Sequence, residues 1–116
     1  MSEPTTEALR EKKCLPCEGG VPVIEADQAR RYRESTPDWQ LSDDAKWISR
    51  DLVCKHFVEV MGKVNQIADI AEADGHHPDL HITGYRKLRI ELTTHAIGGL
   101  SENDFILAAK IDQILE

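Results

Sequence analysis

Residues 57–78 read FVEVMGKVNQIADIAEADGHHP, and this stretch decides the fold. Its apolar residues recur at the i, i+3, i+4, i+7 spacing that places side chains on one face of a helix. They are Phe57, Val60, Met61, Val64, Ile67, Ala68 and Ala71. Gly75 stands where a left-handed residue often ends a helix, and Pro78 prevents the helix from resuming. We therefore expect a helix from His56 to Asp74, followed by a rigid Gly-His-His-Pro corner that presents its side chains outward.

A hairpin is predicted immediately after this corner. Leu80 and Ile82 alternate with polar residues, Gly84 supplies a turn, and the segment Leu88–Leu92 alternates again. Strict alternation of apolar and polar residues is typical of a strand with one buried face. Upstream of the long helix, the segments 39–41 and 46–53 flank a polar turn and predict a first hairpin.

Two more helices complete the predicted domain. One runs from about Glu25 to Glu34 and is closed by Pro37, while the other starts at a Ser101 to Asp104 capping box and reaches about Leu115. The order is helix, hairpin, helix, hairpin, helix. It predicts an α+β domain over residues 23–116, with a four-stranded antiparallel sheet and about three helices packed on one face.

Length and charge restrict the classes of function. The chain has 116 residues, enough for one domain, and its 14 basic against 21 acidic residues give a formal net charge of −7. Such a chain lacks the broad basic surface that nucleic-acid backbones require. It has no apolar run of the roughly 20 residues that a membrane-spanning helix needs. Its first residues also do not show the basic and then apolar pattern of a signal peptide. We expect a cytoplasmic protein with no nucleic-acid or membrane partner.

Residues 1–22 are expected to form a flexible leader. They contain Cys14 and Cys17, a CxxC pair without the preceding strand of a thioredoxin-type site or the second pair of a zinc site. We interpret them as spare thiols, and Cys54, beside an apolar strand, as a core residue. Three cysteines do not make a disulfide framework and suit a reducing compartment.

Three histidines are candidates for chemistry. His76 and His77 follow the long helix directly, and His95 comes after the clearest strand. If that strand persists, alternation places Thr93 and His95 on the sheet face that the helices leave uncovered. Each could instead be an ordinary surface or capping histidine, and the pattern by itself leaves both interpretations open.

A metal site is the weaker functional interpretation of this region. His76, His77 and His81 lie close together in the sequence, with acidic residues nearby. Pro78 makes a helix improbable here, so His77 and His81 would not share a helical face. We expect no metal.

The spacing of several residues resembles a known family. Glu72, His76-His77-Pro78, Tyr85, His95 and Asp104 are separated by three, six, nine and eight residues. This looks like the signature of the pterin-4a-carbinolamine dehydratases, and residues 39–71 and 93–101 also resemble that family. The gap before Tyr85 is the longer of the family's variants, and Leu80 replaces an aromatic residue of animal members. Both departures concern the preference for the pterin side chain.

The resemblance implies an activity. A family member would dehydrate a 4a-hydroxytetrahydropterin to the quinonoid dihydropterin, recycling the tetrahydropterin (tetrahydrobiopterin) cofactor that aromatic amino-acid hydroxylases consume. No metal or organic cofactor is implied, and a hydroxylase would be the pathway partner. The resemblance also implies a homo-oligomer, a dimer or a tetramer. Val58 and Ile70 lie outside the main stripe of the long helix, and the last helix is apolar on more than one face, which favours the same conclusion.

The resemblance assigns roles residue by residue. His76 and His95 would be the acid and base, in either order, while His77 would position the substrate or share the proton transfer. Glu72 would orient an imidazole or bind the pterin, or it is a solvated helix carboxylate. Further residues expected to line the pterin are Gly75, Thr93, Thr94 and Ala96. Residues with structural roles in the motif would be Pro78, Tyr85 and Asp104.

Two other functions are compatible with the sequence. Animal members of the resembled family also stabilise dimers of a transcription factor through a helical surface, so the long helix here could serve a non-catalytic interaction protein. The second alternative function is a pterin-related role in molybdopterin metabolism. An assay of dehydratase turnover would separate the enzyme from the binding protein.

Overall fold

The structure is a computed structural model that describes residues 4–15 and 21–116. The elements, in chain order, are α1 (Thr6–Glu11), α2 (Ala26–Arg33), β1 (Gln40–Leu41), β2 (Ile48–Val53), α3 (Phe57–Asp74), β3 (Asp79–Thr83), β4 (Lys87–Leu92), the short 3₁₀ helix η1 (His95–Ile97) and α4 (Glu102–Leu115). None of the helices in these ranges is long and apolar enough to cross a membrane.

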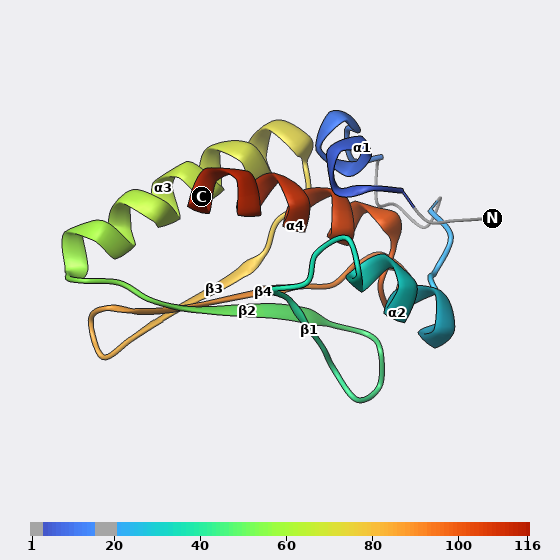
Figure 1. Cartoon of the computed structure of the whole chain (residues 1–116), viewed down its shortest axis with the longest axis horizontal. Coiled ribbons are helices and arrows are strands. Elements are labelled where there is room, and N and C mark those ends of the chain that lie inside the picture. Colours follow the sequence, from blue (N-terminus) through green and yellow to red (C-terminus); the bar gives the residue numbers. More distant parts are fainter. Residues whose placement is uncertain (1–3, 16–20) are drawn as a thin grey trace.

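The four strands form one antiparallel sheet in the order β1-β2-β4-β3. The long helices α3 and α4 lie side by side on one face of it, with α1 beside α4, while the other face is open to solvent (Figure 1). The prediction of an α+β fold with a four-stranded antiparallel sheet and helices on one face is therefore confirmed.

The helix that decides the fold begins and ends where its sequence predicts. Nδ1 of His56 accepts a hydrogen bond from the backbone N–H of Glu59 and caps the first turn. Gly75 ends the helix with φ of 66°, a left-handed conformation that costs glycine little. The chain then turns into β3, so the end of α3 and the start of β3 lie at the same end of the sheet.

The core lies between the sheet and α4. Leu88, Ile90 and Leu92 point from β4 toward the helices and are fully buried or nearly so. Residues 103–109 of α4 are all buried, because the sheet, α3 and α1 surround this helix. In the sequence analysis, the several apolar faces of this helix favoured an oligomer. The structure shows that these faces are largely covered within one chain.

The structure differs from the sequence prediction at the N-terminus, where a flexible leader was expected. Residues 6–11 form α1, and the side chain of Leu9 is fully buried against the core. Nε of Arg10 donates to the carbonyl oxygen of Ala109 at 3.0 Å. The single apolar side chain facing α4 gave no periodic pattern, and for that reason the sequence did not reveal this helix.

Cys14 also differs from the expectation of a spare thiol. Its side chain is buried, and its Sγ donates to the carbonyl oxygen of Asn103 in α4. The side chain of Asn103 forms two hydrogen bonds with the backbone of Leu15. Cys17 lies outside the described residues. Cys54 is buried, as predicted, and burial raises the pKa of its thiol.

Replacing Leu9 tests whether α1 belongs to the folded unit. We expect Leu9→Ala to lower the free energy of unfolding by about 2–5 kcal/mol, because the substitution leaves a cavity between α1 and α4. Urea denaturation followed by circular dichroism measures this. Leu15→Ala is the matched control, since the Leu15 side chain is exposed. Equal midpoints for the two variants would show that α1 adds no stability.

Candidate functional site

A buried carboxylate joins three elements at one end of the sheet. Asp104, in the first turn of α4, has a fully buried side chain. Its Oδ1 lies 2.6 Å from Nε2 of His76, and its Oδ2 accepts from Oγ1 of Thr94 at 2.8 Å and from the backbone N–H of Ser101 at 2.9 Å. A carboxylate only accepts hydrogen bonds, so the first contact requires a proton on Nε2 of His76. Asp104 thus has the predicted capping role and also holds His76 and Thr94.

The Gly-His-His-Pro corner directs its two histidines differently. The backbone N–H groups of Gly75 and His76 donate to the carbonyl oxygens of Glu72 and Ala71, which closes the last turn of α3. We expected both histidines to point outward, but the side chain of His76 is 5% exposed and turns into the protein toward Asp104. The left-handed Gly75 reverses the chain at this point, and it sends His76 inward and His77 outward.

His77 is exposed and lies beside Glu72. Its Nε2 is 2.8 Å from Oε1 of Glu72. Contact with an imidazole is one of the three interpretations offered above for that carboxylate. Both side chains are largely in solvent, where such a contact contributes little stability. Its geometric effect is to orient the imidazole of His77 from the end of α3.

His95 lies at the same end of the sheet, after β4. The strand ends at Leu92, so the alternation argument does not extend to His95, which begins η1. Its exposed ring packs edge-on against Trp47, with ring centroids 5.6 Å apart and an interplanar angle of 77°. The backbone N–H of Thr94 donates to the carbonyl oxygen of Gly99 and closes the loop that carries His95. The sequence did not single out Trp47, because a tryptophan in a predicted strand gives no functional signal.

The threonines before His95 use their hydroxyl groups inside the protein. Oγ1 of Thr93 donates to the carbonyl oxygen of Lys46 at 2.6 Å, and Oγ1 of Thr94 contacts Asp104 and lies 2.8 Å from Oγ of Ser101. Both threonines are buried, whereas Ala96 is exposed. The exposed side chains of this segment are therefore those of His95 and Ala96.

Tyr85 does not have the packing role that we expected. It lies in the β3–β4 turn, at the opposite end of those strands from His95, and its side chain is exposed. Both Gly84 and Tyr85 have a positive φ, in the three-residue loop 84–86 that joins the paired residues Thr83 and Lys87. The turn geometry directs the ring into solvent. Pro78 is half-buried and begins the path into β3.

The histidines contact separate carboxylates. His76 contacts Asp104, His77 contacts Glu72, and Nε2 of His81 lies 2.6 Å from Glu91 on the open sheet face. Within residues 4–15 and 21–116, no three His, Cys, Asp or Glu side chains are grouped so that they could hold a metal ion.

A neighbouring acidic residue fixes the start of α4 from the other side. Glu102 accepts hydrogen bonds from Nζ of Lys12 and from the hydroxyl of Tyr32. Burial raises the pKa of Glu102, but these two donors lower it more, so that its pKa lies below its ordinary value. Glu102 is therefore an ionised anchor between α1, α2 and α4.

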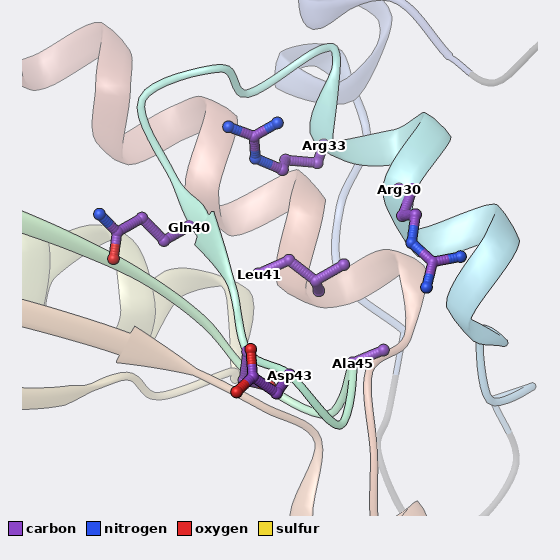
Figure 2. Close-up of a pocket in the computed structure, with 7 residues that line it drawn as sticks. Arg30, Arg33, Gln40, Leu41, Asp43 and Ala45 are labelled. Atoms are coloured by element: carbon purple, nitrogen blue, oxygen red, sulfur yellow. The ribbon is translucent and has the colours of Figure 1, made fainter.

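One cavity of the molecule lies away from the motif residues. It measures about 610 Å³ and lies between α2 and the β1–β2 hairpin. Figure 2 shows Arg30 and Arg33 on the side of α2, with Leu41, Asp43 and Ala45 on the side of the hairpin. Nε of Arg33 donates to the carbonyl oxygen of Trp39, so this arginine also fastens α2 to the hairpin.

Comparisons with known proteins agree on one family. A family model described as pterin 4 alpha carbinolamine dehydratase matches residues 22–114. A Nitrosomonas eutropha protein provisionally named pterin-4-alpha-carbinolamine dehydratase is 46% identical over 108 residues, covering 92% of this chain and 93% of that protein. The Arabidopsis thaliana protein "Pterin-4-alpha-carbinolamine dehydratase 2, mitochondrial" is 41% identical over 91% of this chain and 58% of its own length. A solved Brucella melitensis structure, titled transcriptional coactivator/pterin dehydratase, has a TM-score of 0.76 at 26% identity and covers 82% of this chain and 100% of its own.

Replacing Asp104 tests the network around it. We expect Asp104→Ala to cost about 3–5 kcal/mol of folding free energy, because His76, Thr94 and the Ser101 N–H would lose a buried acceptor. The measurement is urea unfolding at neutral pH. Glu72→Ala, which removes an exposed carboxylate from the same region, should leave the midpoint unchanged. An Asp104→Ala midpoint equal to that of the wild type would contradict the structural role.

Proposed function

Because the chain belongs to the pterin-4-alpha-carbinolamine dehydratase family, we propose that it converts a 4a-hydroxytetrahydropterin to the quinonoid dihydropterin and water by histidine acid–base catalysis. The observation that carries this proposal is the placement of two exposed imidazoles, His77 and His95, at one end of the sheet. They flank a buried network that fixes the segments bearing them. The proposal includes a cytoplasmic role in recycling a tetrahydropterin cofactor.

The reaction requires two proton transfers and no change of oxidation state. The C4a–O bond breaks while one imidazolium donates a proton to the departing hydroxyl, which leaves as water. A second imidazole accepts the proton from N5, and the electron pair of the N5–H bond forms the new double bond between N5 and C4a. Imidazole can donate or accept a proton near neutral pH, and so two histidines are sufficient.

The burial of His76 changes the roles inferred from the sequence. His76 and His95 were expected to be the acid–base pair, but Nε2 of His76 is engaged by Asp104 and the side chain is almost covered. We assign the two proton transfers to His77 and His95, which solvent reaches. His76 then positions its neighbour His77, because the contact with Asp104 holds the Gly-His-His-Pro corner in place. Only the small exposed part of the His76 ring could contact the pterin. Glu72, Gly75 and Ala96 complete the rim of the site.

The proposal also includes assembly of the chain into a homo-oligomer. Exposed large hydrophobic residues gather at the end of the molecule opposite His95, where β2 ends, α3 begins and β3 turns into β4 (Figure 1). Val58, in the first turn of α3, is 74% exposed. Apolar side chains grouped in this way favour a contact between copies, a dimer or a tetramer.

A second candidate function is a protein-binding role for the same surface. The solved Brucella melitensis protein of similar fold is titled both a coactivator and a pterin dehydratase. The exposed start of α3 is the surface here that could bind another protein. Turnover of a carbinolamine substrate separates the two candidates, because a purely binding protein would not accelerate dehydration.

Substitution of the histidines tests the catalytic proposal. We expect His77→Ala and His95→Ala each to lower kcat by about 10²–10⁴-fold, with a smaller change in KM, because each removes a general acid or base. The assay follows dehydration of a freshly generated 4a-hydroxytetrahydropterin against the uncatalysed rate, with and without a chelator, which should have no effect. His76→Ala should lower both kcat and thermal stability.

His56→Asn is the matched control for these variants. It removes an imidazole but keeps an N-cap acceptor at the start of α3, so that kcat should stay within about twofold of the wild-type value. A folded His95→Ala protein with near-normal kcat would refute the assignment. Activity that a chelator abolished and zinc restored would refute a mechanism without metal.

The oligomer is tested by sedimentation at micromolar concentration. We expect the wild type to sediment as a dimer or tetramer and Val58→Asp to shift toward smaller species, because a charge would be buried in the contact. Leu15→Asp places the same charge on an exposed apolar residue near α1, away from this surface, and should leave the sedimentation unchanged. A wild-type monomer at this concentration would contradict the proposal.

A further inference from the structure

The two exposed histidines of the site are oriented by partners of different chemistry. His77 contacts the carboxylate of Glu72 at the end of α3. The ring of His95 packs instead against the indole of Trp47, with ring centroids 5.6 Å apart and an interplanar angle of 77°. This edge-to-face arrangement is one that aromatic rings favour. No step of the proposed reaction uses Trp47.

The imidazole of His95 needs a partner, because the loop that carries it fixes only its backbone. The N–H of Gly98 donates to the carbonyl oxygen of His95 at 3.2 Å, and the side chain itself is exposed. Within residues 4–15 and 21–116, the contact with Trp47 is the one interaction found for the ring of His95. An exposed imidazole without such a contact turns about two bonds and takes several orientations.

Trp47 is itself held by the turn that joins β1 to β2. Oγ of Ser42 accepts hydrogen bonds from the backbone N–H groups of Trp47 at 3.0 Å and of Lys46 at 3.2 Å. The N–H of Ser42 donates to the carbonyl oxygen of Trp47 at 2.9 Å, and its hydroxyl donates to Oδ1 of Asp44 at 2.6 Å. Ser42 therefore fixes both backbone polar groups of Trp47.

A further hydrogen bond ties this turn to the segment that carries His95. Just beyond the end of the β2–β4 ladder, Oγ1 of Thr93 donates to the carbonyl oxygen of Lys46 at 2.6 Å. This bond joins the residue before Trp47 to a residue two positions before His95. The indole and the imidazole thus approach each other from two segments whose backbones are held together.

We infer that Trp47 is a positioning residue for His95, whose imidazole it holds in the orientation from which a proton is exchanged with the substrate. The turn centred on Ser42 supports the indole in this role. The inference rests on the proposed function, which gives His95 a proton transfer. An edge-to-face pair favours one arrangement by about two- to tenfold, much less than the effect of a general acid or base. Trp47 therefore sets how often His95 is ready to react.

The kinetics of dehydration test this role. We expect Trp47→Leu, which keeps an apolar side chain without a ring, to lower kcat by about three- to tenfold with little change in KM. The substrate would still bind, but beside an imidazole that is less often in position. Trp47→Phe restores an aromatic ring and should return kcat to within about twofold of the wild-type value. A raised KM with unchanged kcat would overturn the inference, because it indicates direct contact between the indole and the substrate.

The effect of Trp47 should pass through His95. In a His95→Ala background, Trp47→Leu should cause no further loss of kcat, since no imidazole remains to be held. Ser42→Ala keeps both rings and should lower kcat by about two- to threefold, so it reports on the turn even if Trp47→Leu folds poorly. Asp43→Ala, an exposed position in the same turn (Figure 2), is the matched control and should leave kcat and KM unchanged.

Proton NMR tests the contact without turnover. The ring current of the indole should displace the signals of the carbon-bound ring protons of His95 in the wild type. This displacement should vanish in Trp47→Leu and be retained in Asp43→Ala. The ring protons of His77, which lies beside Glu72, should keep their positions in both variants.

The outcomes separate the positioning role from the proposed reaction. A displacement that depends on Trp47, in a protein that does not accelerate dehydration, would support the orientation of His95 and refute the reaction. In an active protein, three results would overturn the inference. They are a wild-type kcat in folded Trp47→Leu, an equal loss of kcat in the His95→Ala background, and His95 signals that are the same with and without the indole.

Discussion

The contact between Asp104 and His76 is the constraint on which the rest of the site depends. One carboxylate without solvent contact accepts from the end of α3, the end of β4 and the start of α4. A buried carboxylate is tolerated only when its hydrogen bonds are satisfied, and here three donors converge on it. The same contacts that satisfy this charge therefore fix the two segments that carry His77 and His95. The proposed catalytic geometry and the folding stability therefore depend on the same contacts of Asp104.

The different roles that we propose for His76, His77 and His95 follow from this arrangement. The side chain of His76 is buried, whereas His77 and His95 are exposed, and for this reason we assign the proton transfers to the exposed pair. The ring of Trp47 packs edge-on against the imidazole of His95. In the proposed reaction, the buried network would position the exposed histidines, and those histidines would carry out the proton transfers.

Much of the fold could be predicted from the sequence because its signals are local. The apolar stripe of α3, the stop at Gly75 and the alternation in β4 each depend on a few neighbouring residues, and the structure has these elements within one or two residues of their predicted ends. The inward turn of His76 was not predictable in this way, because it depends on Asp104, 28 residues away in the chain. Packing of α1 through Leu9 and contact of Trp47 with His95 likewise depend on the tertiary fold. The residue types and their spacing were sufficient to recognise the motif. They did not show that His76, rather than His77 or His95, has its side chain in the interior.

The antiparallel order of the strands has a consequence for an assembled protein. β3 and β4 start and finish at opposite ends of the sheet. His77 and His95 lie at one end, and the exposed side chains of Val53, Phe57, Val58, Ile82 and Tyr85 lie at the other. Six residues of β4 separate these ends by about 20 Å. Copies joined through the apolar end would hold their reaction centres at the outer extremities of the particle, each open to substrate and remote from its counterpart. Saturation of such a particle should follow a simple hyperbola, with every subunit working independently of its neighbours.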